Sequence, residues 1–291
     1  MDRVKKEIGY FCEEMNQCTK MGEKVTVAIL DTGIAWHPDL TDRVIQFQDF
    51  VNGKTGIYDD SGHGTHVAGI LAGNGRLSNG ILAGIAPKAD MVVIKILDEK
   101  GEGKLEQILK GIDWVKKHHK KYGISVVNLS AGIRTGMNSE KEGCLLYAIE
   151  ELWDMGLIVV VSAGNLGPQK GSITIPGISR KVITVGALKA SREDSCSGRG
   201  PTRECIIKPD ILAPGCQIIS CSVMTEKVKK PYTVKSGTSM ATPVISGAIA
   251  VLLAEDSGIS NIEMKMKLLR SCDYAGNRAF HMERFLKEKY F

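Results

Sequence analysis

Residues 25–33 read VTVAILDTG, a run of small and β-branched apolar residues that ends at an aspartate. A strand with one solvated face alternates polar and apolar residues, so this continuous run indicates a strand that is buried on both faces. Similar runs occupy 91–97, 125–130, 157–163 and 181–187. Helical patterns separate the runs, and buried strands that alternate with helices are typical of a parallel sheet. The sequence therefore predicts an α/β fold, a three-layer sandwich with a mostly parallel central sheet flanked by helices.

Several segments between and after these strands have apolar residues at helical spacing. They cover 63–72, 104–118, 142–154, 238–254 and 260–271. Ser260 and Glu263 have the spacing of a capping box, in which the serine hydroxyl and the glutamate carboxylate satisfy backbone N–H groups at the start of a helix. We therefore expect the last of these helices to begin at Ser260.

The first 21 residues differ from the rest of the chain. Apolar residues recur in them at helical spacing, at Val4, Ile8, Phe11, Cys12 and Met15. We expect an amphipathic, helical extension over 1–21 that either covers part of the body or restrains its activity. Because no linker or composition break follows, residues 22–291 are predicted to form a single domain.

The charge of the chain is close to balanced, with 38 Lys and Arg against 33 Asp and Glu and a net charge of +5. The basic residues are scattered, and KKHHKK at 116–121 is the one dense group. At the C-terminus of a helix such a group suits the negative end of the helix dipole, so we interpret it as a solvated face. We expect no binding to nucleic acid.

The sequence also bears on the compartment. No run approaches the length of a membrane-spanning helix, and the start of the chain lacks the apolar core of a secretion signal. Eight cysteines show no CxxC pair and no dense disulfide pattern, which indicates reduced thiols. We expect a cytoplasmic protein with no membrane partner. The sequence leaves its oligomeric state open.

Three residues with complementary chemistry stand where strands end or helices begin. Asp31 directly follows the first strand, His63 lies where glycines give way to a helix, and Ser239 lies at the head of the long apolar helix. Reactive groups collect beyond the carboxyl ends of parallel strands, and an acid, an imidazole and a hydroxyl together can make a serine nucleophilic. Taken alone, each has a structural explanation as a turn former, a locally bonded ring or a helix cap. Their joint occurrence favours catalysis.

Several motifs around these residues occur in a fixed order. They are DTGI at 31–34, HPDL at 37–40, HGTHVAG at 63–69, SAGN at 162–165 and GTSMATP at 237–243. In this order they closely resemble the subtilisin-like serine proteases, a family with the order Asp, His, Ser along the chain. The resemblance covers roughly residues 24–272. It implies a subtilisin-like fold and a serine endopeptidase that hydrolyses peptide bonds through an acyl-enzyme intermediate.

The same resemblance implies a role for each residue. Asp31 would orient the imidazole, His63 would act as general base and then general acid, and Ser239 would attack the scissile carbonyl. Asn165 would donate its side-chain amide to the oxyanion, beside the backbone N–H of the serine. This chemistry requires no cofactor. A catalytically silent, peptide-binding relative is the alternative, but its usual mark is the loss of one of these residues, and none is lost here.

Substrate contacts follow from the same comparison. An extended peptide or protein segment would add as a strand between two edges, with a pocket for the residue that precedes the cut. The residues expected to contact substrate are Gly101, Glu102, Gly103, Ser130, Ala131, Gly132, Ser162, Ala163, Gly164 and Thr174.

Metal binding is the weakest expectation. His63 and His66 lack the glutamate of a zinc-peptidase motif, so we predict no catalytic metal and interpret His66 as a packing residue. Asp39 in HPDL matches a carboxylate that helps to bind structural calcium in relatives of this family. Calcium needs about six oxygen ligands, and the sequence nominates this one alone. Structural calcium is therefore a possibility and not a requirement.

Overall fold

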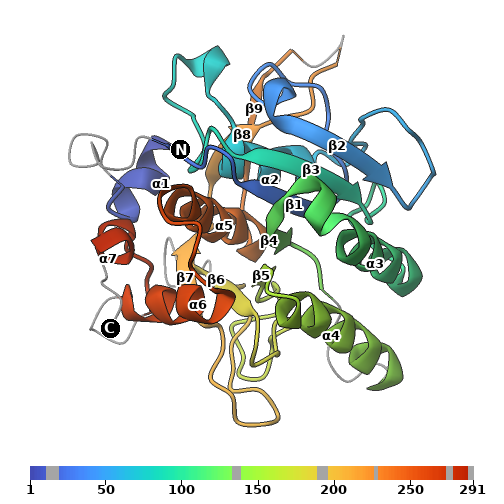
Figure 1. The fold of residues 1–291 in the computed structure, drawn as a ribbon, viewed down its shortest axis with the longest axis vertical. Coiled ribbons are helices and arrows are strands. Elements are labelled where there is room, and N and C mark those ends of the chain that lie inside the picture. Colours follow the sequence, from blue (N-terminus) through green and yellow to red (C-terminus); the bar gives the residue numbers. More distant parts are fainter. Residues whose placement is uncertain (11–19, 133–138, 189–195, 226–228, 273–277, 288–291) are drawn as a thin grey trace.

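A seven-stranded sheet lies at the centre of the computed structural model (Figure 1). The structure describes the chain apart from residues 11–19, 133–138, 189–195, 226–228, 273–277 and 288–291. The strand order is β2-β3-β1-β4-β5-β6-β7, and every neighbouring pair is parallel. The strands are β1 (Thr26–Asp31), β2 (Val44–Asp49), β3 (Asp90–Lys95), β4 (Ile124–Leu129), β5 (Ile158–Ser162), β6 (Ile183–Leu188) and β7 (Ile211–Pro214).

Helices form the two outer layers. They are α1 (Asp2–Glu7), α2 (His63–Ala72), α3 (Leu105–Tyr122), α4 (Ser139–Asp154), α5 (Thr238–Glu255), α6 (Asn261–Arg270) and α7 (Met282–Lys287). In one layer α2 packs against α5, and in the other α3 packs against α4 (Figure 1). A separate antiparallel hairpin, β8 (Ile218–Cys221) and β9 (Tyr232–Lys235), packs through β8 on α2. The predicted three-layer α/β sandwich is confirmed.

The predicted elements agree closely with the observed ones. All five apolar runs are strands, and all five helical patterns are helices. Ser260 caps α6 as expected, because its hydroxyl accepts from the backbone N–H of Glu263 while the Glu263 carboxylate accepts from the backbone N–H of Ser260. No apolar run predicts β2, since it lies at one edge of the sheet and most of its residues are only partly buried.

The long apolar helix α5 corrects one expectation. By length and composition it could cross a membrane, although the sequence analysis found no run of that length. However, 83% of the tested window is buried inside the protein. A helix that is apolar all round needs a fully apolar environment, and here the sheet and α2 provide it.

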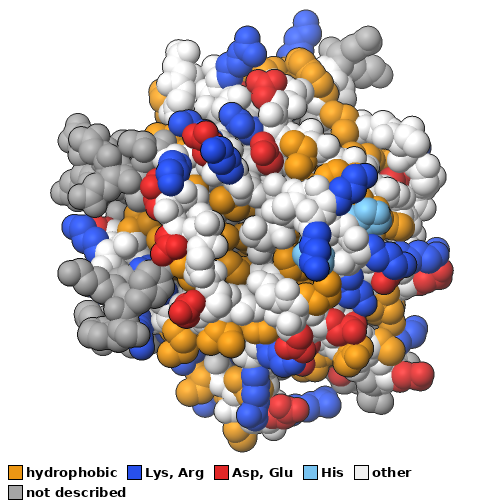
Figure 2. Space-filling model, in the orientation of Figure 1, with side chains coloured by type: hydrophobic (Ala, Val, Ile, Leu, Met, Phe, Trp, Pro, Cys, Tyr) orange, Lys and Arg blue, Asp and Glu red, His pale blue; other side chains and the backbone are white. Residues whose placement is uncertain are grey.

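Charged side chains of both signs are interspersed over the face seen in Figure 2. No large area of one sign stands out on that face, in keeping with the scattered basic residues of the sequence.

The sheet order explains where chemistry can gather. The first strand along the chain, β1, lies in the middle of the sheet. The chain then adds β2 and β3 on one side of β1 and β4 to β7 on the other. Loops that leave neighbouring strands in opposite directions open a crevice at the carboxyl ends, and here β1 and β4 border it. Asp31 ends β1, and Ser130 directly follows β4.

The described part of the N-terminal segment packs on the body. Met1, Val4 and Ile8 are buried, and the carbonyl of Ile8 accepts a 2.6 Å hydrogen bond from the backbone N–H of Met282. The Tyr10 hydroxyl donates to the Ile85 carbonyl at 3.2 Å. Of the apolar positions expected to pack, Phe11, Cys12 and Met15 lie outside the described residues.

His66 on α2 joins this helix to the β8–β9 hairpin. Its Nε2 lies 3.1 Å from the Ile218 carbonyl and 3.2 Å from the Thr233 carbonyl, and its own carbonyl accepts from the Ser220 hydroxyl at 2.8 Å. The ring is fully buried, and burial lowers the pKa of His66 to about 4. His66 therefore has the packing position expected for it.

We predict that replacing Ile8 by Ala lowers the free energy of unfolding by about 2–5 kcal/mol, because a fully buried branched side chain leaves a cavity. Denaturant titration measures the change. Lys6→Ala is the control, since Lys6 is exposed in the last turn of α1, just before Ile8, and should shift stability by less than about 0.5 kcal/mol. Equal stability of the two variants would mean that α1 contributes nothing to the fold.

We predict a second, pH-dependent effect on stability at His66. The folded state holds the ring neutral down to about pH 4, whereas the unfolded chain takes up the proton near pH 6.5. Stability should therefore fall as the pH drops through this window, by up to about 3 kcal/mol. His66→Gln should remove this share of the pH dependence in melts recorded from pH 7 to pH 4. An unchanged pH dependence in the variant would contradict the assignment.

Candidate active site

His63 and Asp31 form a close hydrogen-bonded pair at the crevice, with Asp31 fully buried and His63 partly exposed. His63 Nδ1 lies 2.6 Å from Asp31 Oδ1, and the backbone N–H of Thr32 donates to the same oxygen at 2.7 Å. Burial disfavours protonation of the His63 ring, but the charge and hydrogen bond of Asp31 outweigh it and raise the pKa of His63. The contact at Nδ1 fixes the tautomer, so Nε2 is the nitrogen left for proton transfer.

Two glycines allow this pair to form. A methyl group at Gly64 would lie 2.1 Å from the carbonyl oxygen of Gly33, so α2 can begin this close to the end of β1 only without a side chain. Gly33 itself has a φ of +115°, and a methyl group there would meet the carbonyl oxygen of Tyr58 at 2.2 Å. The glycines of DTG and HGTH therefore serve the approach of Asp31 to His63.

Asp59 holds the two segments together. It is nearly fully buried, and its carboxylate oxygens accept hydrogen bonds of 2.7–3.2 Å from the backbone N–H groups of Ser61, Gly62 and Thr65 and from the hydroxyls of Thr32 and Thr65. Thr32 follows Asp31, and Gly62 precedes His63. The Asp59 carboxylate therefore fixes the residues next to both Asp31 and His63.

A buried lysine supports the same turn from the other side. Lys95 ends β3 beside Asp31 and has no exposed surface. Its ammonium donates to the Thr32 carbonyl at 2.6 Å, the Asp60 carboxylate at 2.7 Å and the Leu97 carbonyl at 2.9 Å. Because three acceptors surround the charge, burying it is tolerated, and the backbone after Asp31 is held in place.

Ser239 lies in the first turn of α5, and its position has a local cause. Pro243, inside the helix, has no N–H to donate to the Ser239 carbonyl four residues earlier. That carbonyl accepts instead from the Ser130 hydroxyl at 3.4 Å, and the Ser239 hydroxyl donates to the Ser130 carbonyl at 3.1 Å. The start of α5 is thereby tied to the loop after β4. The hydroxyl is not directed at His63 in this structure.

A buried polar chain extends this tie into the core. The Ser246 hydroxyl donates to Asn128 Oδ1 at 2.8 Å, and Asn128 Nδ2 donates to the Ser130 hydroxyl at 3.1 Å. Both Asn128 and Ser246 are fully buried. These hydrogen bonds fix the position of Ser130 relative to α5, and Ser130 in turn contacts Ser239.

Asn165 faces the head of α5. Its Oδ1 accepts from the backbone N–H of Thr238 at 3.0 Å and from the Thr238 hydroxyl at 3.1 Å. A backbone N–H can only donate, so the atom facing it must be the oxygen, and Nδ2 takes no part in this contact. The Cys196 thiol also lies 3.8 Å from Asn165 Oδ1.

A cleft of about 550 Å³ brings these groups together. His63, Ser239 and Asn165 line it, and Asp31 lies behind His63. Of the residues expected to contact substrate, the structure places the following in the wall: Gly101, Glu102, Gly103, Ser130, Ala131, Gly132, Ser162, Gly164 and Thr174. Ala163 is fully buried behind the wall, where its carbonyl accepts from the backbone N–H of Thr174. The Thr174 hydroxyl is buried and has no hydrogen-bond partner among the described residues.

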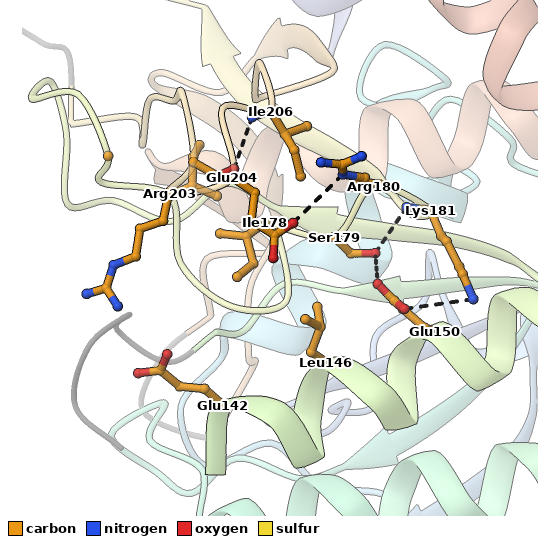
Figure 3. A pocket seen from close by; sticks show the side chains of 13 residues that line it. Glu142, Leu146, Glu150, Ile178, Ser179, Arg180, Lys181, Arg203, Glu204 and Ile206 are labelled. Atoms are coloured by element: carbon orange, nitrogen blue, oxygen red, sulfur yellow. Dashed lines mark hydrogen bonds and ion pairs between the residues drawn. The ribbon is translucent and has the colours of Figure 1, made fainter. Parts of the chain in front are cut away.

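A second hollow, of about 450 Å³, lies between α4 and the segments 171–181 and 202–206 (Figure 3). Leu146, Ile178 and Ile206 give it an apolar surface, and much of its charge is paired internally, as between Lys181 and Glu150 and between Arg180 and Glu204. The Ser179 hydroxyl in this hollow donates to the Glu150 carboxylate at 2.6 Å, but no histidine is among the described lining residues, whereas the cleft has a serine and an imidazole together.

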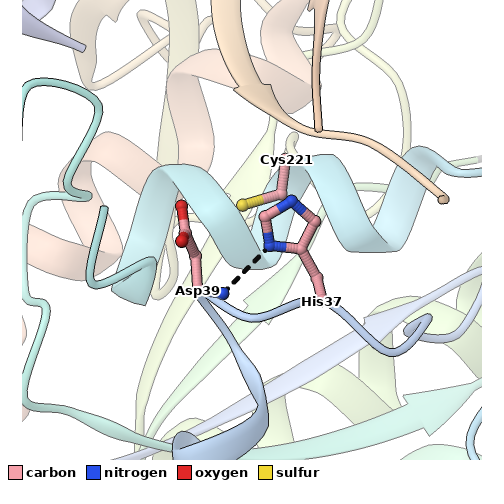
Figure 4. Close-up of side chains that lie close together, drawn as sticks. All are labelled: His37, Asp39 and Cys221. Atoms are coloured by element: carbon pink, nitrogen blue, oxygen red, sulfur yellow. Dashed lines mark hydrogen bonds between the residues drawn. The ribbon is translucent and has the colours of Figure 1, made fainter. Parts of the chain in front are cut away.

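The surroundings of Asp39 bear on metal binding. His37, Asp39 and Cys221 are buried together, with ligand atoms within 4.8 Å of one another (Figure 4). Asp39 accepts from the Leu77 N–H at 2.9 Å and from the Tyr232 hydroxyl at 2.6 Å, and both His37 nitrogens have backbone partners. Calcium prefers oxygen ligands, so a thiol and an imidazole beside Asp39 do not fit it. Structural calcium stays a prediction that these donors do not favour.

Sequence reasoning missed the residues that act through others. Thr32 lies within DTGI, whereas Asp59, Lys95 and Asn128 lie outside the motifs. None of them reveals its role in the sequence, because a buried polar residue and an exposed one look alike there. For Asp59 the available signal is its place four residues before His63, at the start of a predicted helix. For Cys196, which lies far from Asn165 along the chain, we find no signal.

Comparison with known proteins agrees with this geometry. The chain is 42% identical over 279 residues to Serine protease AprX of Bacillus subtilis, a match that covers 89% of this chain and 63% of that protein. It is 33% identical over 263 residues to Subtilisin DY of Bacillus licheniformis, covering 89% of this chain and 88% of that one. Among solved structures, Sphericase aligns with a TM-score of 0.72 at 30% identity, over 86% of this chain and 84% of that one.

The chain spans 63% of the length of AprX and 65% of the length of Thermostable alkaline protease of Halalkalibacterium halodurans, so both of these relatives contain further segments. A model of the Subtilase family matches residues 22–285. Since this match covers nearly the whole chain, the chain belongs to the Subtilase family.

Proposed function

We propose that this protein is a serine endopeptidase that hydrolyses peptide bonds through an acyl-enzyme intermediate. The observation that carries the proposal is the 2.6 Å contact between His63 and Asp31 in a cleft that Ser239 and Asn165 also line. An imidazole held by a buried carboxylate beside a serine at a helix head is the set that makes a hydroxyl nucleophilic. The names of the relatives, serine proteases and subtilisins, support the same reaction.

The first step is acylation. The Ser239 hydroxyl leaves its bond to the Ser130 carbonyl and transfers its proton to His63 Nε2 as Oγ attacks the peptide carbonyl carbon. Hydrogen bonds in a free active site are often poorly aligned and tighten only with substrate, so the hydroxyl direction seen here is compatible with this role. Asp31 stabilises the imidazolium that forms.

The oxyanion of the tetrahedral intermediate then needs donors. The backbone N–H of Ser239 and the Nδ2 of Asn165 would supply them, because Thr238 holds the Asn165 oxygen and so directs the nitrogen. Protonated His63 passes its proton to the leaving amine, which completes the acyl-enzyme. A water molecule repeats the sequence, with His63 first accepting and then returning the proton to Ser239.

We propose peptides and proteins in an extended conformation as the substrates. Segments 101–103 and 130–132 line the cleft and offer edges to which a strand can add. Thr174, with its unpartnered hydroxyl, would floor the pocket for the residue that precedes the cut. We also propose the cytoplasm as the site of action, supported by the free thiols of the described cysteines 144, 196, 205, 216, 221 and 272.

Ser239→Ala tests the proposal directly. We expect a fluorophosphonate to label Ser239 in the natural protein and peptide turnover to fall roughly 10⁴-fold or more in the variant, with the fold intact, because only one oxygen is removed. Ser257→Ala is the control, since this serine is exposed beyond the C-terminal end of α5 and lies outside the cleft. Peptide binding with neither labelling nor turnover would instead favour the catalytically silent relative.

Asp59→Asn tests whether Asp59 supports the contact between Asp31 and His63. An amide cannot accept at its nitrogen, so at least part of the hydrogen bonding to Thr32, Gly62 and Thr65 is lost. We expect kcat to fall roughly 10- to 100-fold with little change in KM, because a small misplacement of the reacting groups slows chemistry more than binding. Weaker contact with Asp31 should also lower the pKa of His63 and move the acid limb of kcat/KM to lower pH.

Asp42→Asn is the matched control, because Asp42 is exposed on the short 3-10 helix Thr41–Arg43. A role for Asp59 in overall stability alone would leave kcat and the pH profile unchanged at temperatures where the variant is fully folded.

A further inference from the structure

A smaller hollow adjoins the cleft beyond His63. Its volume is about 340 Å³, and it shares Ser61 and Lys235 with the cleft. The residues just before α2 form one side of it, and the other side is formed by β9 and by described residues between the two hairpin strands, including Val223, Lys230 and Tyr232. The two spaces therefore meet next to the His63 ring.

Unpaired positive charge distinguishes this hollow. Lys235, at the end of β9, and Lys230, which is exposed, have no ion-pair partner among the described residues. The charge of Lys235 acts on the neighbouring ring, because it opposes the protonation of His63. Two ammonium groups are thus available to a ligand in the hollow.

The acidic groups in the same wall are already engaged. Asp60 pairs with the buried ammonium of Lys95 at 2.7 Å. Asp59 also borders the hollow, but its oxygens accept hydrogen bonds from the donors around the start of α2. Two lysines therefore face one hydrogen-bonded carboxylate, and the hollow carries a local excess of positive charge.

The chemistry of the cleft decides which part of a substrate reaches this place. Protonated His63 must face the nitrogen of the leaving amine, whereas Asn165 and the segment 130–132 face the acyl side. The hollow opens from the cleft past Ser61 and Lys235, next to His63. The residues that follow the scissile bond are therefore the ones that enter it.

We propose that this hollow recognises acidic side chains in the first two or three residues after the scissile bond, with Lys235 and Lys230 as the recognising groups. The inference rests on the proposed peptidase function and adds a substrate class to it. Peptides with Asp or Glu in this part are cleaved in preference to those with neutral or basic residues, whatever precedes the bond.

The expected change in kcat/KM follows from the usual strength of exposed ion pairs in water. Each pair should change kcat/KM roughly 2- to 5-fold, and two pairs together roughly 5- to 20-fold. Because Lys230 is exposed and Lys235 is partly exposed, the preference should shrink as ionic strength rises.

The experiment uses quenched fluorescent peptides with one common sequence before the bond and Asp, Asn or Lys at each of the three positions after it. The natural protein should cleave the Asp peptides fastest and the Lys peptides slowest at low salt. Lys235→Gln and Lys230→Gln should each reduce this ratio, and Lys235→Glu should reverse it. Lys110→Gln is the control, because Lys110 lies on α3 and pairs with Glu106.

A pH profile gives a readout that does not depend on the peptide series. Asp31 and Asp59 favour protonation of His63 and Lys235 opposes it, so Lys235→Gln should raise the pKa of His63 and move the acid limb of kcat/KM to higher pH. The salt dependence of the ratio in the natural protein needs no variant at all.

The possible results distinguish the acidic preference from the peptidase function. A preference for acidic residues that weakens with salt and in the lysine variants supports the proposal. Cleavage of all peptides at equal rates, or a preference that survives in the Lys230→Gln, Lys235→Gln double variant, overturns the proposal and leaves the peptidase function standing. Neither cleavage nor fluorophosphonate labelling overturns both.

Discussion

A buried carboxylate beside an imidazole is costly unless its charge and its geometry are both satisfied, and much of the chain around β1 and α2 meets this requirement for Asp31 and His63. Two glycines let the strand end and the helix start approach each other, Asp59 bonds the neighbours of both residues, and Lys95 holds the backbone after Asp31. The contact of 2.6 Å is the result. Without it, Nε2 would have no fixed direction and the serine no base.

Ser239, the proposed nucleophile, is positioned by a different set of contacts. In α5 a proline removes one helical hydrogen bond, and the freed carbonyl of Ser239 bonds to the loop after β4. The buried chain through Asn128 fixes that loop. The acid–base pair and the serine therefore belong to two separately supported units that meet at the crevice between β1 and β4.

The sequence predicts the fold because periodicity is a local signal. Strands such as 25–30 and helices such as 63–72 can be identified from their own residues, and the reactive residues can be identified because their motifs are short and ordered. The supporting residues cannot, because Asp59 and Lys95 are distinguished only by burial and by partners from other segments. The edge strand β2 and the hairpin β8–β9 are equally hard to predict from the sequence, since neither has the continuous apolar run of a buried strand.

The contact between the segments at α1 and α7 affects how the domain unfolds. Ile8 bonds to Met282 through the backbone, so two segments from opposite ends of the sequence close the chain into a ring of contacts without a covalent bond (Figure 1). Fraying usually starts at a terminus and costs little, because few contacts cross it. Here, releasing one end also releases the other. Opening at this contact therefore costs more than the fraying of a free terminus, and we expect the two segments to unfold together.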